Sequence, residues 1–249
     1  MQELDDRYMD AKSRKTSDIQ VRSMASTYMI HACPQRMWYV EEFLLPSMLA
    51  QGIREDEIEI RNDTEGKGNL QSCMESFRDC GERDQERGVW HLQDDVLISR
   101  DFWAISREVS GPEIACGFAC RNFGPSMQEK GRVPAQFMWY SFQCIYIPNK
   151  IAGECAEWFF DQAVRRSAYT TKIVEKRHDD WFFRQFILER HLDDRVVNLA
   201  PNIVDHVDFL IGGTVINPLR RIKINRAEFF NDQDLVEELA EKLKNRKQG

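Results

Sequence analysis

Two adjacent aspartates, Asp94 and Asp95, are the residues of this 249-residue chain whose types and spacing point most directly to chemistry. They follow the hydrophobic run at 88–92, which is typical of a buried strand. Neighbouring carboxylates repel each other unless a proton or a cation compensates their charge. A hard divalent ion is a natural compensation, because it prefers oxygen ligands and leaves positions for substrate phosphates. By itself, such a pair is more often a polar turn with an aspartate helix cap.

A second acidic pair and one histidine are further candidates for proton transfer or metal binding. The acidic pair Asp179-Asp180 stands at the start of a predicted helix over 179–190, where the helix macrodipole favours negative side chains. His206 lies in the segment APNIVDHV, residues 200–207. A lone histidine is more often a packed side chain than a ligand, so its type alone assigns it no role.

Polar loops follow the predicted strands at 27–32, 58–60 and 88–92. Residues 33–36 come after the first strand and residues 61–69 after the second, and helical periodicity follows each loop. Strands that alternate with helices predict a parallel sheet, in which ligands bind at the carboxyl ends of the strands. We therefore expect these loops and the first acidic pair to lie at one edge of the sheet.

The other elements are predicted from composition and periodicity. The charged residues 1–25 are expected to form a short N-terminal helical arm, and Ser99 is expected to cap a helix over 100–109. A β-prone run is predicted at 138–147, and further helices are predicted at 149–166 and 232–244.

Composition limits the class of protein. The formal charge of −7 argues against a general nucleic-acid coat protein, since phosphate neutralisation needs clustered Lys and Arg. Seven cysteines without tight spacing are a poor disulfide framework and favour a reduced, cytoplasmic protein, in the host cytoplasm if the chain is viral. No apolar run approaches the length of a membrane span, so none is expected.

The segment WHLQDDVLIS at 90–99, followed by Asp101-Phe102, resembles the strand, acidic pair and hydrophobic segment of GT-A glycosyltransferases. The resemblance is closest to the lipopolysaccharide and procollagen type and to small phage-encoded relatives. The segment 200–207 resembles the late stretch of these enzymes in which a histidine completes the metal or diphosphate site. Two adjacent aspartates stand here where the family often has Asp-x-Asp, so the resemblance leaves open which of them contacts the metal.

This resemblance implies one GT-A domain over residues 26–249. Its fold would be α/β, with a Rossmann-like, mixed and mostly parallel sheet flanked by helices, and with a C-terminal helix. Asp95 and His206 would bind Mn²⁺ or Mg²⁺, and Asp94 would help to hold the metal or the donor. An imidazole ligand suits Mn²⁺ better than Mg²⁺.

The resemblance also implies roles for side chains around the metal. In inverting GT-A enzymes, an acidic residue at the start of a helix is the general base for the acceptor hydroxyl. Asp180 or Asp179 fits that position, and Asp180 is the expected base of the two. Such a base contributes about 10²–10⁴ in rate. On the donor side, the implied contacts are Pro34, Arg36, Asn62, Asp63 and Asn69.

The implied reaction moves a sugar from a nucleotide-sugar donor, UDP-linked by expectation, to a hydroxyl acceptor. Phage relatives suggest a modified DNA base as acceptor, and cellular relatives suggest a glycan or a protein hydroxylysine. One alternative is a nucleotidyltransferase, although the glycine-rich loop usual in that class is missing after the first predicted strand. Another is a non-catalytic module that binds a sugar nucleotide or a partner protein. The stereochemical outcome and the oligomeric state stay open.

Overall fold

The computed structural model describes residues 28–118, 131–134, 142–165, 179–212, 227 and 230–246. The strands are β1 (Tyr28–Ala32), β2 (Ile58–Asn62), β3 (Gly88–Gln93), β4 (Val96–Ile98), β5 (Ile114–Cys116), β6 (Gly131–Pro134), β7 (Cys144–Pro148), β8 (Val196–Ala200) and β9 (Val204–His206). The α-helices are α2 (Met37–Tyr39), α3 (Leu45–Ala50), α4 (Asn69–Gly81), α5 (Phe102–Arg107), α6 (Asn149–Arg165), α8 (Asp179–Glu189) and α9 (Gln233–Arg246). A π-helical turn, η1 (Val40–Leu44), joins α2 to α3, and short 3₁₀ turns are η2 (Glu55–Glu57) and η3 (Asp193–Arg195).

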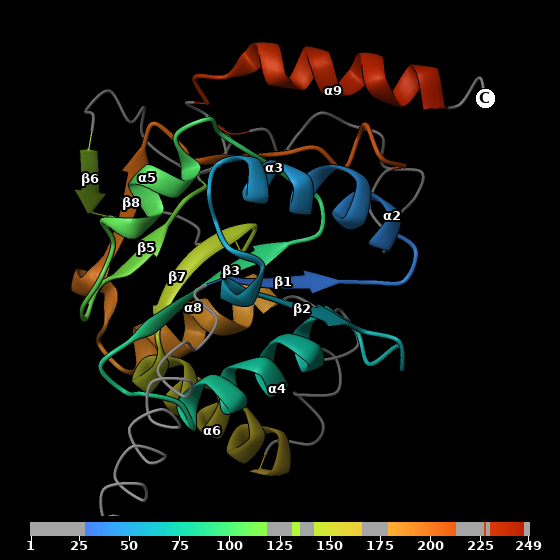
Figure 1. Cartoon of the computed structure of the whole chain (residues 1–249). Helices are drawn as coiled ribbons and strands as arrows, with labels where there is room; N and C mark the ends of the chain where they lie inside the picture. The colour runs from blue at the N-terminus through green and yellow to red at the C-terminus, as the bar shows by residue number, and fades with distance from the viewer. Residues whose placement is uncertain are drawn as a thin grey trace, which may run out of the picture.

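Seven strands form the main sheet, in the order β2-β1-β3-β7-β5-β8-β6. β1 is parallel to both β2 and β3, and β5 is parallel to β8. Because β7 pairs antiparallel with β3 and β5, and β6 antiparallel with β8, the other five strands share one direction. Figure 1 shows α2, α3 and α9 on one side of the sheet and α4 and α6 on the other. The prediction of a mixed, mostly parallel α/β sheet flanked by helices is confirmed.

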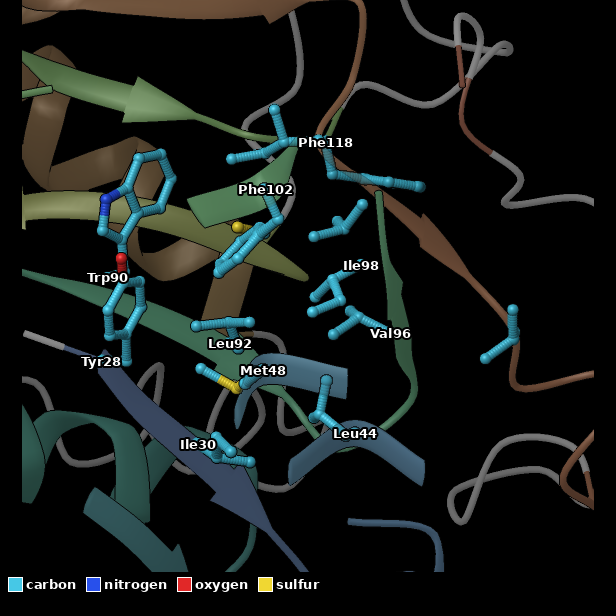
Figure 2. Close-up of a cluster of buried hydrophobic side chains, with 14 of the residues drawn as sticks. Tyr28, Ile30, Leu44, Met48, Trp90, Leu92, Val96, Ile98, Phe102 and Phe118 are labelled. Carbon is cyan, nitrogen blue, oxygen red and sulfur yellow. The ribbon is translucent and has the colours of Figure 1, made fainter. Parts of the chain in front are cut away.

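Alternate residues of the central strands pack into two hydrophobic clusters, one on each face of the sheet. Tyr28 and Ile30 of β1 join the cluster beneath α3 and α5, whereas Met29 joins the cluster beneath α4 and α6. Successive side chains of a strand point to opposite faces, which explains this division. Figure 2 shows the first cluster, where Trp90 and Phe102 pack near one another.

A separate two-stranded sheet, β4 paired antiparallel with β9, connects distant parts of the chain. Its register places Val96 opposite His206. The backbone N–H of Val207 also donates to the carbonyl oxygen of Asp95 at 2.9 Å. This pairing fixes the late histidine beside the turn that follows β3.

Most predicted elements are present, with shifted ends. The helices expected at 149–166 and 179–190 are α6, which is described as far as Arg165, and α8, which ends one residue earlier than expected. The run at 138–147 yields β7 from Cys144, and its residues 138–141 lie outside the described ones, as does the expected arm over 1–25.

The expected cap at Ser99 is wrong. Helix α5 begins at Phe102 with Asp101 in the N-cap position, and neither Asp101 nor another side chain caps it. The buried Ser99 hydroxyl has no partner within the described part of the chain, because the residue continues the path of β4 and contributes only its carbonyl to Phe102. Among the helices described, none is both long and apolar enough to cross a membrane.

Candidate active site

A cavity of about 410 Å³ opens at the carboxyl ends of β1, β2 and β3. This position agrees with the sequence-based expectation for the loops that follow these strands. The predicted site residues that line it are Pro34, Arg36, Asp63, Asn69, Asp94, Asp95, Asp179, Asp180 and His206. Asn62, the last residue of β2, is exposed and does not line the cavity.

Asp94 and Asp95 form the turn between β3 and β4, and a guanidinium lies against both of them. Arg36 Nη1 donates to Asp94 Oδ1 at 3.0 Å and also hydrogen-bonds Asp95 Oδ2. The backbone N–H of Cys33 donates to Asp94 Oδ2 at 2.8 Å. All three charged side chains are buried. The compensation that two adjacent carboxylates require is thus supplied, in this state, by the chain itself.

His206 completes this cluster from the second sheet. Its Nε2 lies 3.1 Å from Asp95 Oδ2, and its Nδ1 lies 3.8 Å from Asp208 Oδ1. Burial alone raises the pKa of Asp95, but Arg36 and His206 outweigh burial and hold that pKa well below its usual range. Burial and the neighbouring Asp95 raise the pKa of Asp94, against the opposing effect of Arg36. Asp95 is therefore the carboxylate that is firmly ionised.

The geometry at Asp95 fits a divalent cation that substrate oxygens also bind. Two ligands at right angles, each about 2.1 Å from an ion, lie about 3.0 Å apart. The 3.1 Å between Asp95 Oδ2 and His206 Nε2 is close to that spacing, and it is also the length of the hydrogen bond that joins the two groups in this structure. Asp95 Oδ1 is buried without a hydrogen-bond partner among the described residues.

A cation at this position would still need ligands from outside the chain. In the described ranges, no three His, Cys, Asp or Glu side chains are arranged to hold a metal ion by themselves. Mg²⁺-like ions are usually bound by one or two carboxylates together with water and substrate phosphates. The residues present fit that kind of centre, and not a cage made by protein alone.

Asp179, the first residue of α8, has uncharged partners instead. Asn69 Nδ2 donates to Asp179 Oδ2 at 2.6 Å, and Gln93 Nε2 donates to the same oxygen at 3.2 Å. The backbone N–H of Asp180 donates to Asp179 Oδ1 at 2.9 Å. Burial, and secondarily the charge of Asp180, raise the pKa of Asp179 to about 7. A carboxyl group with this pKa can accept and release a proton near neutral pH.

The loop between β2 and α4 is held by Asp63. Its two carboxylate oxygens accept the backbone N–H groups of Lys67 at 2.9 Å and Gly68 at 2.7 Å. Gly66 and Gly68 have φ values of 68° and 87°, a conformation that glycine adopts without strain. Asp63 thus shapes the cavity wall by closing this loop.

Two residues of the site were not identified from the sequence. Gln93 contacts Asp179, and Asp208 approaches His206. The signal for Gln93 was its place at the end of β3, directly before the acidic pair. Asp208 follows the histidine by two residues. That spacing does not indicate a contact unless the position of β9 is known.

No protein-family model matches the chain, and no curated protein matches it. Among solved structures, it is similar to the glycosyltransferase GlyE of Streptococcus pneumoniae TIGR4, with a TM-score of 0.40 and 12% identity over 70% of this chain and 45% of GlyE. The apo form of GlyE gives a TM-score of 0.40 and 9% identity over 87% of this chain and 60% of GlyE. The galactosyltransferase LgtC in complex with donor and acceptor sugar analogues gives a TM-score of 0.37 and 13% identity over 86% and 95% of the two chains. The chain spans about half the length of GlyE, and these similarities are too low to assign it to a family.

Proposed function

We propose that this chain is a metal-dependent glycosyltransferase that moves a sugar from a nucleotide-sugar donor to a hydroxyl acceptor. The observation that carries the proposal is one cavity with two kinds of buried carboxylate. Asp94 and Asp95 share Arg36 at one place, where Asp95 also contacts His206, and Asp179, with a pKa of about 7, stands at another. Pairs of acidic groups whose environments separate their pKa values are typical of acid-base enzymes.

The charge of the cavity supports a cation at the donor side. Its lining includes five aspartates and one arginine, Asp63, Asp94, Asp95, Asp179, Asp180 and Arg36. A nucleotide-sugar diphosphate would add further negative charge to this acidic space. A divalent cation between Asp95, His206 and the diphosphate would offset the charge that develops on the leaving group. Manganese is the proposed ion because imidazole suits it better than magnesium.

Asp179 is the proposed general base. Its carboxylate would take the proton from the acceptor hydroxyl as the sugar is transferred, a contribution of about 10²–10⁴ in rate. The amides of Asn69 and Gln93 both donate to Oδ2 and so orient the carboxylate. We prefer Asp179 to Asp180 because these contacts fix its position and because its pKa lies near neutrality.

A donor screen tests this proposal. The purified chain is incubated with UDP-, GDP- and CDP-sugars and with Mn²⁺ or Mg²⁺, and the released nucleotide is measured. We expect metal-stimulated release of a nucleoside diphosphate, with UDP-sugars preferred. Release of pyrophosphate from a nucleoside triphosphate and a sugar phosphate would instead indicate a nucleotidyltransferase. Binding of a sugar nucleotide without any turnover would support the non-catalytic module.

The acceptor is then sought with the donor that the screen identifies. Glycans and hydroxylated DNA bases are the two proposed classes, since both present a hydroxyl group. Mass spectrometry would detect the added sugar on either one.

A further inference from the structure

Arg36 occupies the position where the proposed function requires a metal ion. Its Nη1 contacts Asp95 Oδ2, the same oxygen that lies 3.1 Å from His206 Nε2. It also bridges to Asp94 Oδ1 at 3.0 Å. The side chain is only 7% exposed, so this is an interior ion pair and not a flexible surface contact.

We propose that Arg36 is an exchangeable counter-ion: it neutralises Asp94 and Asp95 until a divalent cation and the donor diphosphate bind, and its guanidinium then moves from the carboxylates to the diphosphate. The inference rests on the proposed function for the identity of the diphosphate. It goes further in assigning one arginine to two alternative partners and in coupling the two binding events.

The two cations exclude each other for electrostatic reasons. A divalent ion bound to Asp95 Oδ2 would stand next to the guanidinium that contacts the same oxygen, and like charges at such a distance repel strongly away from bulk water. Conversely, removing the guanidinium alone would leave two buried carboxylates without their cation, which is costly. Binding of the divalent ion and departure of the guanidinium are therefore each favourable only when both occur.

Both carboxylates have other partners that remain if Arg36 moves away. Asp94 keeps the backbone N–H of Cys33 at 2.8 Å, and Asp95 keeps His206. Arg36 itself lines the cavity, and a guanidinium presents five N–H donors suited to phosphate oxygens. The diphosphate can thus replace the carboxylates as its partner.

This exchange predicts how metal and diphosphate affect each other. Without the diphosphate, the metal must first displace Arg36 from its ion pairs with Asp94 and Asp95, so metal binding is weak. With the diphosphate, Arg36 gains that partner and metal binding strengthens. Linkage requires the effect to be reciprocal, and such couplings typically amount to 5–150-fold.

The test is a Mn²⁺ titration followed by electron paramagnetic resonance of the free ion, with and without UDP. Wild type, Arg36→Gln and Arg36→Lys are compared, and uridine replaces UDP as the control without phosphates. We expect Arg36→Gln to bind Mn²⁺ about tenfold more tightly than wild type when no nucleotide is present. UDP should strengthen Mn²⁺ binding about tenfold more in wild type than in Arg36→Gln, and uridine should have no effect in either.

Arg100→Gln is the matched control variant. Arg100 also pairs with carboxylates, those of Asp232 at 3.0 Å, Asp234 at 2.7 Å and Glu238 at 3.6 Å, but it lies outside the cavity. Its loss should leave Mn²⁺ affinity unchanged. Circular dichroism establishes that each variant is folded.

Arg36→Gln binding Mn²⁺ no more tightly than wild type would overturn the exchange. If that variant does not fold, Arg36→Lys decides the question, because it keeps a charge on a shorter donor group and should show a smaller gain in Mn²⁺ affinity; no gain would also overturn it. Coupled Mn²⁺ and UDP binding without sugar transfer would keep the exchange and remove the proposed activity. Sugar transfer that needs no divalent cation would keep the transferase activity and overturn the exchange.

Discussion

Two groups of buried carboxylates line the same cavity and differ in their partners. Asp94 and Asp95 contact a cationic guanidinium, and Asp95 also contacts His206. Asp179 contacts the neutral amides of other side chains and a backbone N–H. The result is opposite pKa shifts in Asp95, whose pKa is lowered, and Asp179, whose pKa rises to about 7.

The difference shows that burial alone does not decide what a carboxylate can do. Desolvation disfavours the charged form in every case. At Asp95 the charges of Arg36 and His206 outweigh it, whereas at Asp94 the neighbouring Asp95 adds to desolvation and Arg36 does not outweigh the two. A carboxylate that a cation keeps ionised can bind a metal ion. A carboxylate that amides orient without neutralising can accept a proton. The following variants remove one of these carboxylates or one of its partners.

Asp95→Asn should have the largest effect. The amide keeps the shape of the side chain but removes the charge that the proposed metal needs, so kcat/KM for sugar transfer should fall by about 10³-fold. Arg36 would still pair with Asp94, and circular dichroism should show an intact fold. Asp208→Asn, which removes a contact 3.8 Å from His206, serves as the milder comparison. Undiminished turnover by Asp95→Asn would refute the metal assignment.

Asp179→Asn should lower kcat by at least about 100-fold, because an amide cannot accept the proton of the acceptor hydroxyl. Donor binding, measured by calorimetry with UDP and Mn²⁺, should change little. Asp180→Asn is the matched control, since it alters the next residue of the same helix. A greater loss in Asp180→Asn than in Asp179→Asn would move the proposed base to Asp180.

The contributions of Asp179 and Asp95 to folding stability should depend on pH in opposite ways. The pKa of Asp179 is raised, so its contribution is fully present below the unfolded value of 3.8 and is lost as the pH rises through about 7. The pKa of Asp95 is lowered, so its contribution is present above the unfolded value and is lost in acid. Urea unfolding between pH 4 and 7 should show wild type losing stability relative to Asp179→Asn. Parallel curves for the two proteins would contradict the raised pKa.

Asn69→Ala should have the smallest effect, a loss of several-fold in kcat at neutral pH. Removing the amide at 2.6 Å withdraws a hydrogen bond that favours the ionised carboxylate, so the pKa of Asp179 should rise further. The acidic limb of the pH–rate profile should shift to higher pH, which a merely structural defect would not produce. Gln71→Ala on the same helix is the control, because Gln71 bonds Glu75 and does not line the cavity. A lower kcat with an unmoved profile would exclude a positioning role.

The sequence predicted well the strands and helices that carry the site. Alternating and helical hydrophobic patterns indicate which side chains are buried, and they located β1, β3 and the helix at Asn149–Arg165 within a few residues. The rule that parallel strands end at one edge then predicted the shared position of the loops. The failure at Ser99 has a local reason, since a favourable cap residue is used only where the chain turns into a helix.

The partners inside the cavity could not be predicted in this way. Asn69 and Arg36 are predicted to contact the donor, and both predictions stand. The sequence did not indicate that the Asn69 amide bonds Asp179, which is 110 residues away, or that Arg36 meets Asp94 and Asp95. Such contacts depend on side-chain directions and on distances of a few ångströms between elements, and periodicity carries no information about either.

The sequence by itself determined that acidic residues follow buried strands and begin a helix, because residue type and hydrophobic spacing are local properties. Only the tertiary structure decided which cation or amide each carboxylate meets. The pairing of β4 with β9 brought His206 to Asp95, and the packing of α4 and α8 brought Asn69 to Asp179. Since the partner sets the charge state of a buried acid, the chemistry assigned to each aspartate was decided at that level.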